Sequence, residues 1–158
     1  MKHFTLAAFA VERRVAALAI FSGSRLDVTR LRHLPLDSSK ASGTLRDLVT
    51  EVLKHHHPEF VAISRPSEKS SDRIRSFCEL VKDMAGELVI PAVEVDDKTL
   101  MSAYGHPPLK RKEFVRRTGR VIWPSLKVCK SQKASVDAAL AGLYVQTERL
   151  FSLYEGAA

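Results

Sequence analysis

Short apolar runs separated by polar turns dominate the start of the chain. Continuous apolar runs over 4–11 and 15–22, joined by the polar stretch 12–14, are typical of two buried strands connected by a hairpin. A third, half-exposed strand is predicted over 26–34, where apolar and polar residues alternate imperfectly until Pro35 ends the pattern. We therefore expect three consecutive antiparallel strands.

Helical spacing of apolar residues begins after a loop that is rich in Ser, Lys and Gly, at 37–43. Thr44 is the expected N-cap of this helix, which ends in the run 55–57 and is stopped by Pro58. A short apolar strand over 59–64 follows. Because a helix precedes it, this strand is expected to run parallel to an earlier one.

The same alternation continues in the second half of the chain. Ser70 and Ser71 are candidate caps for a second amphipathic helix, which ends near Gly86. A strand is predicted over 88–95, and Pro91 inside it favours an edge position or a bulge. The last element is a helix over 134–154.

The element order predicts an α/β fold over one domain, 1–158, with a five-stranded mixed sheet flanked by helices. Three strands are antiparallel, and right-handed crossovers place the two later, parallel strands beside the first. The ends of strand 1 and of both parallel strands then meet the start of the last helix in one crevice, where such sheets bind ligands. The stretch 98–126 is the least regular, with one helix expected over 110–118.

Composition places the chain among globular proteins, with 45% hydrophobic and 27% charged residues. No apolar run approaches the roughly 20 residues that cross a bilayer, so no membrane association is expected. Cys78 and Cys129 form neither a metal-spaced pair nor a disulfide framework, which suits a reducing cytoplasm.

Positive charge is concentrated in one segment. The chain carries a net charge of +7, and the segment 104–133 alone holds nine basic residues against one acid, or +8. Clustered charge of this kind favours a polyanionic partner, so we expect nucleic-acid binding, whereas the alternative interpretation is a solubilising surface. The residues expected to contact phosphates are Lys110, Arg111, Lys112, Arg116, Arg117 and Arg120.

One acid lies in the apolar stripe of the last helix. Asp137 is near the first turn, where burying a carboxylate is costly unless it has a partner or a function. Stabilisation of the helix N-terminus is the alternative role. The run His55-His56-His57 does not indicate a metal site, because successive helical residues point in different directions.

Four short motifs, in order, resemble those of the RuvC/YqgF branch of the ribonuclease H-like superfamily, the Holliday-junction resolvases. They are Arg14-Val15-Ala16 in the first hairpin, Ser64-Arg65-Pro66 after the fourth strand, Val95-Asp96-Asp97-Lys98, and Val136-Asp137 with Ala141 and Gln146 in the last helix. The resemblance implies a ribonuclease H-like fold and action on branched DNA. It further implies a homodimer, although no residue of the sequence itself requires one.

The resemblance also implies two Mg²⁺ ions held by carboxylates, with Asp137 and Asp97 as metal ligands. For Asp97 the alternative role is that of an ordinary turn residue after a strand. The strand-1 acid that bridges both ions is missing, because Phe9 stands at its position and both neighbours are alanines. Glu12 is the candidate replacement.

Three interpretations stay open. The preferred one is a nucleic-acid-binding protein of the RuvC/YqgF type whose metal site is degenerate, with Phe9 replacing the acid. The second is an active Mg²⁺-dependent, structure-specific endonuclease that uses Asp137, Asp97 and Glu12. The third is a non-catalytic scaffold that kept the fold.

Overall fold

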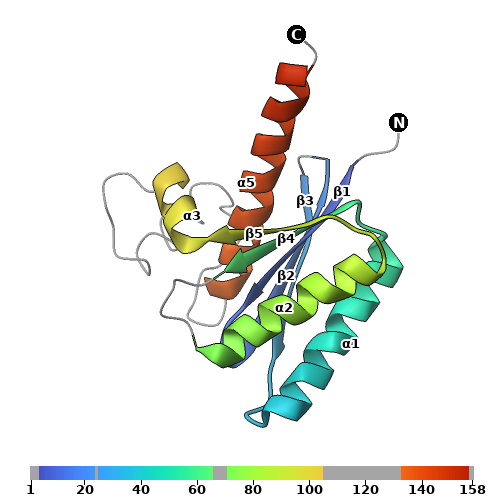
Figure 1. Ribbon diagram of the computed structural model, residues 1–158, viewed down its shortest axis with the longest axis vertical. Coiled ribbons are helices and arrows are strands. Elements are labelled where there is room, and N and C mark those ends of the chain that lie inside the picture. The colour runs from blue at the N-terminus through green and yellow to red at the C-terminus, as the bar shows by residue number, and fades with distance from the viewer. Residues whose placement is uncertain (1–3, 24, 66–70, 105–132, 157–158) are drawn as a thin grey trace.

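The structure is a computed structural model that describes residues 4–23, 25–65, 71–104 and 133–156. Its centre is one five-stranded mixed sheet with the strand order β3-β2-β1-β4-β5 (Figure 1). The strands are β1 (Thr5–Val11), β2 (Val15–Ser22), β3 (Arg25–His33), β4 (Phe60–Arg65) and β5 (Ala92–Asp96). The first three pair antiparallel, and β4 and β5 run parallel to β1, which confirms the predicted fold class.

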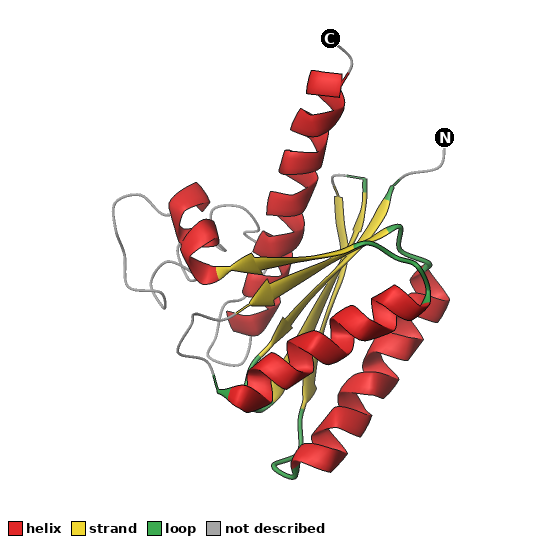
Figure 2. Ribbon diagram, viewed as in Figure 1, coloured by secondary structure: helices red, strands yellow, loops and turns green. Residues whose placement is uncertain are grey.

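Helices cover both faces of the sheet (Figure 2). They are α1 (Ser38–His56), α2 (Asp72–Glu87), α3 (Asp97–Tyr104) and α5 (Lys133–Gly156). α1 and α2 pack on one face, and α5 packs on the other. Within the ranges given above, no helix is both long and apolar enough to span a membrane.

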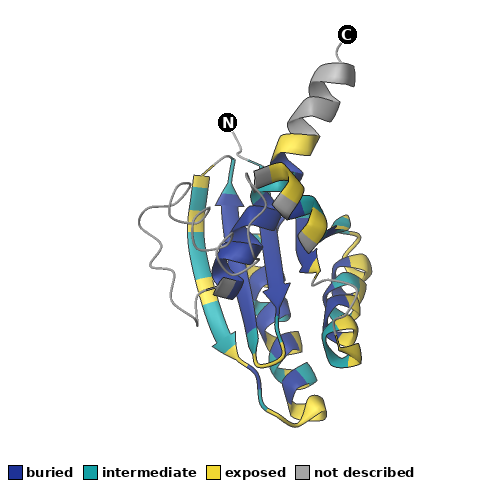
Figure 3. Ribbon diagram, turned by 90° about the vertical axis from the view of Figure 1, so that its left-hand side faces the viewer, coloured by how far each residue is buried: buried dark blue, intermediate teal, exposed yellow. Residues whose placement is uncertain are grey.

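Strand β1 serves two separate cores, because successive residues of a strand point to opposite faces. Its side chains in the core with α1 and α2 are Ala7, Phe9 and Val11. Its side chains in the core with α5 are Leu6, Ala8 and Ala10. β1 and β2 are buried along almost their whole length, whereas the edge strand β3 is partly exposed (Figure 3).

Helix α1 begins earlier than predicted. Asp37, not Thr44, is its N-cap, and the Asp37 carboxylate accepts a hydrogen bond of 3.0 Å from the Lys40 amide. The Thr44 hydroxyl lies inside the helix and donates to the Lys40 carbonyl oxygen at 3.0 Å. The Ser-, Lys- and Gly-rich composition of this stretch predicts a loop, but Ala41 and Leu45 form a buried pair at helical spacing.

The region around β5 also differs from prediction. β5 begins only after Pro91, and Val89 before it has a positive φ of 57°, so the predicted strand 88–95 starts four residues too early. The edge position indicated by Pro91 is confirmed. The last helix is confirmed, helix α3 was not predicted, and the helix expected over 110–118 lies outside the described residues.

Helix α5 packs closely on the sheet because small side chains lie on both surfaces. A Cβ added at Gly142 would lie 2.5 Å from Cε2 of Phe21 and 3.1 Å from the Cβ of Ala8. The sheet residues of this core include Ala8, Ala10, Ala17, Ala19 and Ala62. Gly142 therefore fixes where α5 crosses β1 and β2.

Gly142→Ala is expected to lower the free energy of unfolding by about 1–3 kcal/mol, because the Phe21 ring is itself buried and has little room to move. The matched control is Gly43→Ala in α1, where no atom lies within 4 Å of the added Cβ. This change should stabilise the protein by about 0.5–1 kcal/mol, through helix propensity alone. Denaturant unfolding of both variants measures the difference, and a similar gain in both would contradict the packing of α5.

Candidate functional site

Helix α5 runs against the direction of β1, and this brings its first turns to the C-terminal end of that strand. The Gln146 side-chain amide donates to the carbonyl oxygen of Gly23, whose own amide donates to the Phe4 carbonyl oxygen at 2.7 Å. Gln146 therefore lies near the start of β1. Asp137, nine residues earlier, lies toward the strand's other end.

The position of Asp137 along β1 follows from the contact between Gly142 and Ala8. Five helical residues separate Gly142 from Asp137, a rise of about 7.5 Å. Two residues of a strand cover about 6.6 Å, so Asp137 comes level with about Ala10. The Asp137 side chain is only 2% exposed.

The sheet beneath this point carries no carboxylate. Ala10, Ser64 and Val95 are cross-strand neighbours on β1, β4 and β5. Ala10 and Val95 belong to the core with α5, and Ser64 is buried between them in the same row. A methyl group, a hydroxyl and an isopropyl group thus occupy the row where three parallel strands end.

The prediction that Phe9 occupies the position of the missing acid is wrong, because its side chain does not face α5. Phe9 is fully buried in the core with α1 and α2, on the face of the sheet away from α5. The motif gives the position of Phe9 along the chain but not the face of the sheet to which its side chain points. The β1 residue that faces α5 at this level is Ala10, which has no carboxylate either.

Glu12 and Asp97 come directly after the ends of β1 and β5. Ala10 on β1 and Val95 on β5, each two residues earlier, belong to the core with α5. Glu12 is half-buried, and its Oε1 atom is inaccessible to solvent. Asp97 is the first residue of α3, and its side chain lies outside the described part. The roles of Asp137, Asp97 and Glu12 as metal ligands stay predictions.

Asp96 has a structural role that the sequence analysis missed. Its Oδ1 atom accepts a hydrogen bond of 2.8 Å from the Thr99 amide and so caps the N-terminus of α3. This bond to the backbone, together with the Thr99 hydroxyl, lowers the pKa of the Asp96 carboxyl below its ordinary value, and the nearby Arg65 and Lys98 add to the effect. The sequence signal was an Asp followed three residues later by Thr.

The potential metal ligands among the described side chains do not gather in one place. No group of three or more His, Cys, Asp or Glu side chains in the described ranges is close enough to hold an ion.

The run 55–57 ends α1 near the start of β1, where the Glu59 amide donates to the Thr5 carbonyl oxygen at 2.8 Å. The run 55–57 therefore lies at one end of the strands, and Asp137 lies at the other. The predicted phosphate-binding residues from Lys110 to Arg120 lie outside the described residues.

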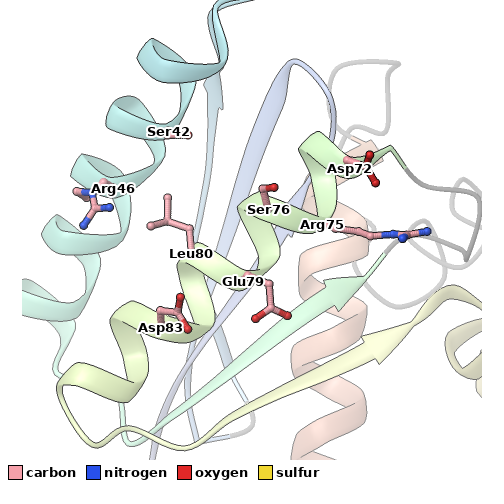
Figure 4. A pocket seen from close by; sticks show the side chains of 8 residues that line it. All are labelled: Ser42, Arg46, Asp72, Arg75, Ser76, Glu79, Leu80 and Asp83. Atoms are coloured by element: carbon pink, nitrogen blue, oxygen red, sulfur yellow. The ribbon is translucent and has the colours of Figure 1, made fainter.

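Two hollows lie on the surface of the described part. One, of about 470 Å³, is bounded by Asp96 and the exposed side of α3 and by Tyr144 of α5. The other, of about 520 Å³, lies between α1 and α2 (Figure 4). The charged residues that line the second are Arg46, Asp72, Arg75, Glu79 and Asp83. Its mixed charge does not favour a polyanion.

Comparison with known proteins gives a match in structure but not in sequence. No protein-family model matches the chain, and no curated protein does. RuvC from Thermus thermophilus in complex with a Holliday junction substrate has a TM-score of 0.72 at 19% identity, over 94% of this chain and 96% of that one. The yeast mitochondrial Holliday junction resolvase has a TM-score of 0.65 at 9% identity, over 99% of this chain and 85% of that one.

These similarities define the class of fold. The chain has a ribonuclease H-like fold. Its arrangement is that of the RuvC-type resolvases, which confirms the fold that the four sequence motifs implied.

Asp96→Ala is expected to lower the free energy of unfolding by about 0.5–2 kcal/mol through loss of the α3 cap. Asp96→Asn keeps an acceptor but cannot ionise. Because the pKa of Asp96 is lower in the folded protein than its ordinary 3.8, the ionised Asp96 makes the wild type more stable than Asp96→Asn, and this difference in stability is fully present above pH 3.8. The difference is lost as the pH falls through the folded pKa. Denaturant unfolding from pH 7 to pH 3 measures it, and an Ala variant as stable as the wild type at pH 7 would contradict the cap.

Proposed function

We propose that this protein binds nucleic acid, above all branched DNA, in the cytoplasm, through a RuvC-type scaffold whose metal site is degenerate. The observation that carries the proposal is Ala10 at the end of β1, level with Asp137. Mg²⁺ requires oxygen ligands in near-octahedral geometry, and the row formed by Ala10, Ser64 and Val95 provides one hydroxyl and no carboxylate. A phosphodiester would be held here without two ions to activate water.

The binding part of the proposal is supported by charge. The segment 104–133 carries +8, so it accounts for the whole positive charge of the chain. Fixed cations attract a phosphate backbone whether or not hydrolysis follows, because counterion release drives binding. RuvC of similar fold is known in complex with a Holliday junction. A two-fold junction suits a homodimer, and we include that assembly in the proposal.

The second candidate is an active endonuclease, and the burial of Asp137 and of one Glu12 oxygen on the same side of the sheet favours it. In that case Asp137, Asp97 and Glu12 would hold Mg²⁺ and supply a divalent ion to the scissile phosphate. A nicking assay on a four-way junction with Mg²⁺ or Mn²⁺ separates the two candidates. Cleavage that disappears in Asp137→Asn supports the enzyme, and intact junction with bound protein supports the degenerate site.

Binding to a labelled four-way junction is expected to weaken steeply between 50 and 200 mM salt. Neutralising Arg116, Arg117 and Arg120 to Gln should reduce the slope of log affinity against log salt by about 2.7, if each contacts one phosphate. The matched control replaces three cations elsewhere, at Arg25, Arg46 and Lys54, with the same loss of charge. Fluorescence anisotropy over a salt series measures both slopes. A wild type that binds no DNA even at low salt would favour the scaffold interpretation instead.

A further inference from the structure

The turn between β1 and β2 presents two adjacent arginines. The Glu12 amide donates to the Val15 carbonyl oxygen at 2.7 Å, which leaves Arg13 and Arg14 as the two residues at the tip. Both side chains are exposed. The Arg14 carbonyl oxygen accepts a hydrogen bond of 2.7 Å from the Leu34 amide, so the tip is attached to the end of β3. The two guanidinium groups are therefore carried by a well-supported piece of backbone.

The backbone of this turn does not itself select arginine. Two-residue hairpin turns often use Asn-Gly or Asp-Gly, because their central residues adopt a positive φ. Neither Arg13 nor Arg14 has a positive φ, which among the described residues occurs at Gly23, His57 and Val89. Turns with negative φ accept most residue types, so the turn leaves both side chains available for binding.

The tip lies beyond the C-terminal end of β1, at the end of the sheet that holds the candidate site. We call this end the site edge of the sheet. One residue, Glu12, separates the tip from Val11, the last residue of β1. Near this end of β1, Ala10 pairs with Ser64 of β4, which pairs with Val95 of β5. Asp137 approaches the same end of β1 from α5. Strand ends and helix starts meet at this edge, where open α/β sheets bind their ligands.

The charges at the tip are not neutralised by neighbours. In the parts of the chain that the structure covers, no ion pair involves Arg13 or Arg14. Three other exposed arginines do pair with acids. They are Arg25 with Asp27 at 2.6 Å, Arg30 with Glu51 at 3.0 Å and Arg65 with Glu94 at 3.4 Å. A guanidinium group without a carboxylate partner can present its planar set of donors to a phosphate.

We propose that Arg13 and Arg14 form a phosphate-binding clamp for the sugar-phosphate backbone of a nucleic-acid strand at this edge of the sheet. The inference rests on the proposed function and adds to it a second contact element, separate in sequence from the basic segment 104–133.

The test compares Arg13→Gln/Arg14→Gln with a control that removes the same charge, Arg25→Gln/Arg46→Gln, at sites away from this edge. Anisotropy with a labelled four-way junction and with a 20-base-pair duplex, over a salt series, reports the affinities. The tip variant should bind on the order of tenfold more weakly at 100 mM salt, and its salt slope should fall by about 1.8. The control should keep the wild-type slope. Arg13→Lys/Arg14→Lys should recover most of the slope, because the charge is restored, and circular dichroism verifies that each variant is folded.

The outcomes separate the clamp from the function on which it depends. If the wild type binds and the tip variant binds equally well, the clamp is wrong and the proposed function stands. If the tip and control variants lose affinity by the same amount, the effect is one of overall charge and the clamp is again wrong. If the wild type binds neither probe at low salt, the proposed function is wrong and the clamp with it.

Discussion

The close packing of α5 on the central strands determines everything at the candidate site. Gly142 lies over Ala8 and Phe21, and a side chain at that position would push the helix away from the sheet. Because this crossing is fixed, the rise of the helix from Gly142 places Asp137 level with the end of β1. The alanines that line this face are thus structural, and Ala10 belongs to the same surface. The small residue that accommodates the helix is also the residue that leaves the site without a bridging carboxylate.

Binding a phosphate backbone and hydrolysing it make different demands on a protein. Binding needs fixed positive charge, which this chain carries in the segment 104–133 and at the tip of the first hairpin. Hydrolysis by two metal ions needs several carboxylates within a few ångströms of each other. An acid at the end of β1 is therefore needed for hydrolysis only, and the proposed binding of nucleic acid does not depend on it.

The sequence predicted the strands and the last helix well, because buried strands and amphipathic helices have distinct periods. It failed where a local signal competed with composition. The start of α1 was misplaced because Asp37 caps a stretch whose composition suggests a loop. The resemblance places the missing acid at Phe9, whereas the structure has Ala10 on the face toward α5. A motif gives the distance along a chain, but the face of a strand follows from its pairing. The cap at Asp96 was overlooked because the helix it begins, α3, has only eight residues and a weak pattern.

The central claim is that Ala10, and not Phe9, occupies the position where a metal-bridging acid is missing. Thermal unfolding of Ala10→Asp and of the wild type, with and without 1 mM Mn²⁺, tests it most directly, because an ion that binds only the folded state raises its midpoint. The account predicts no Mn²⁺ effect on the wild type, a lower midpoint for Ala10→Asp without metal, and a rise of that midpoint with Mn²⁺. Phe9→Asp should lose stability with no recovery. A midpoint that rises with Mn²⁺ in the wild type, or in Phe9→Asp but not in Ala10→Asp, would contradict the account.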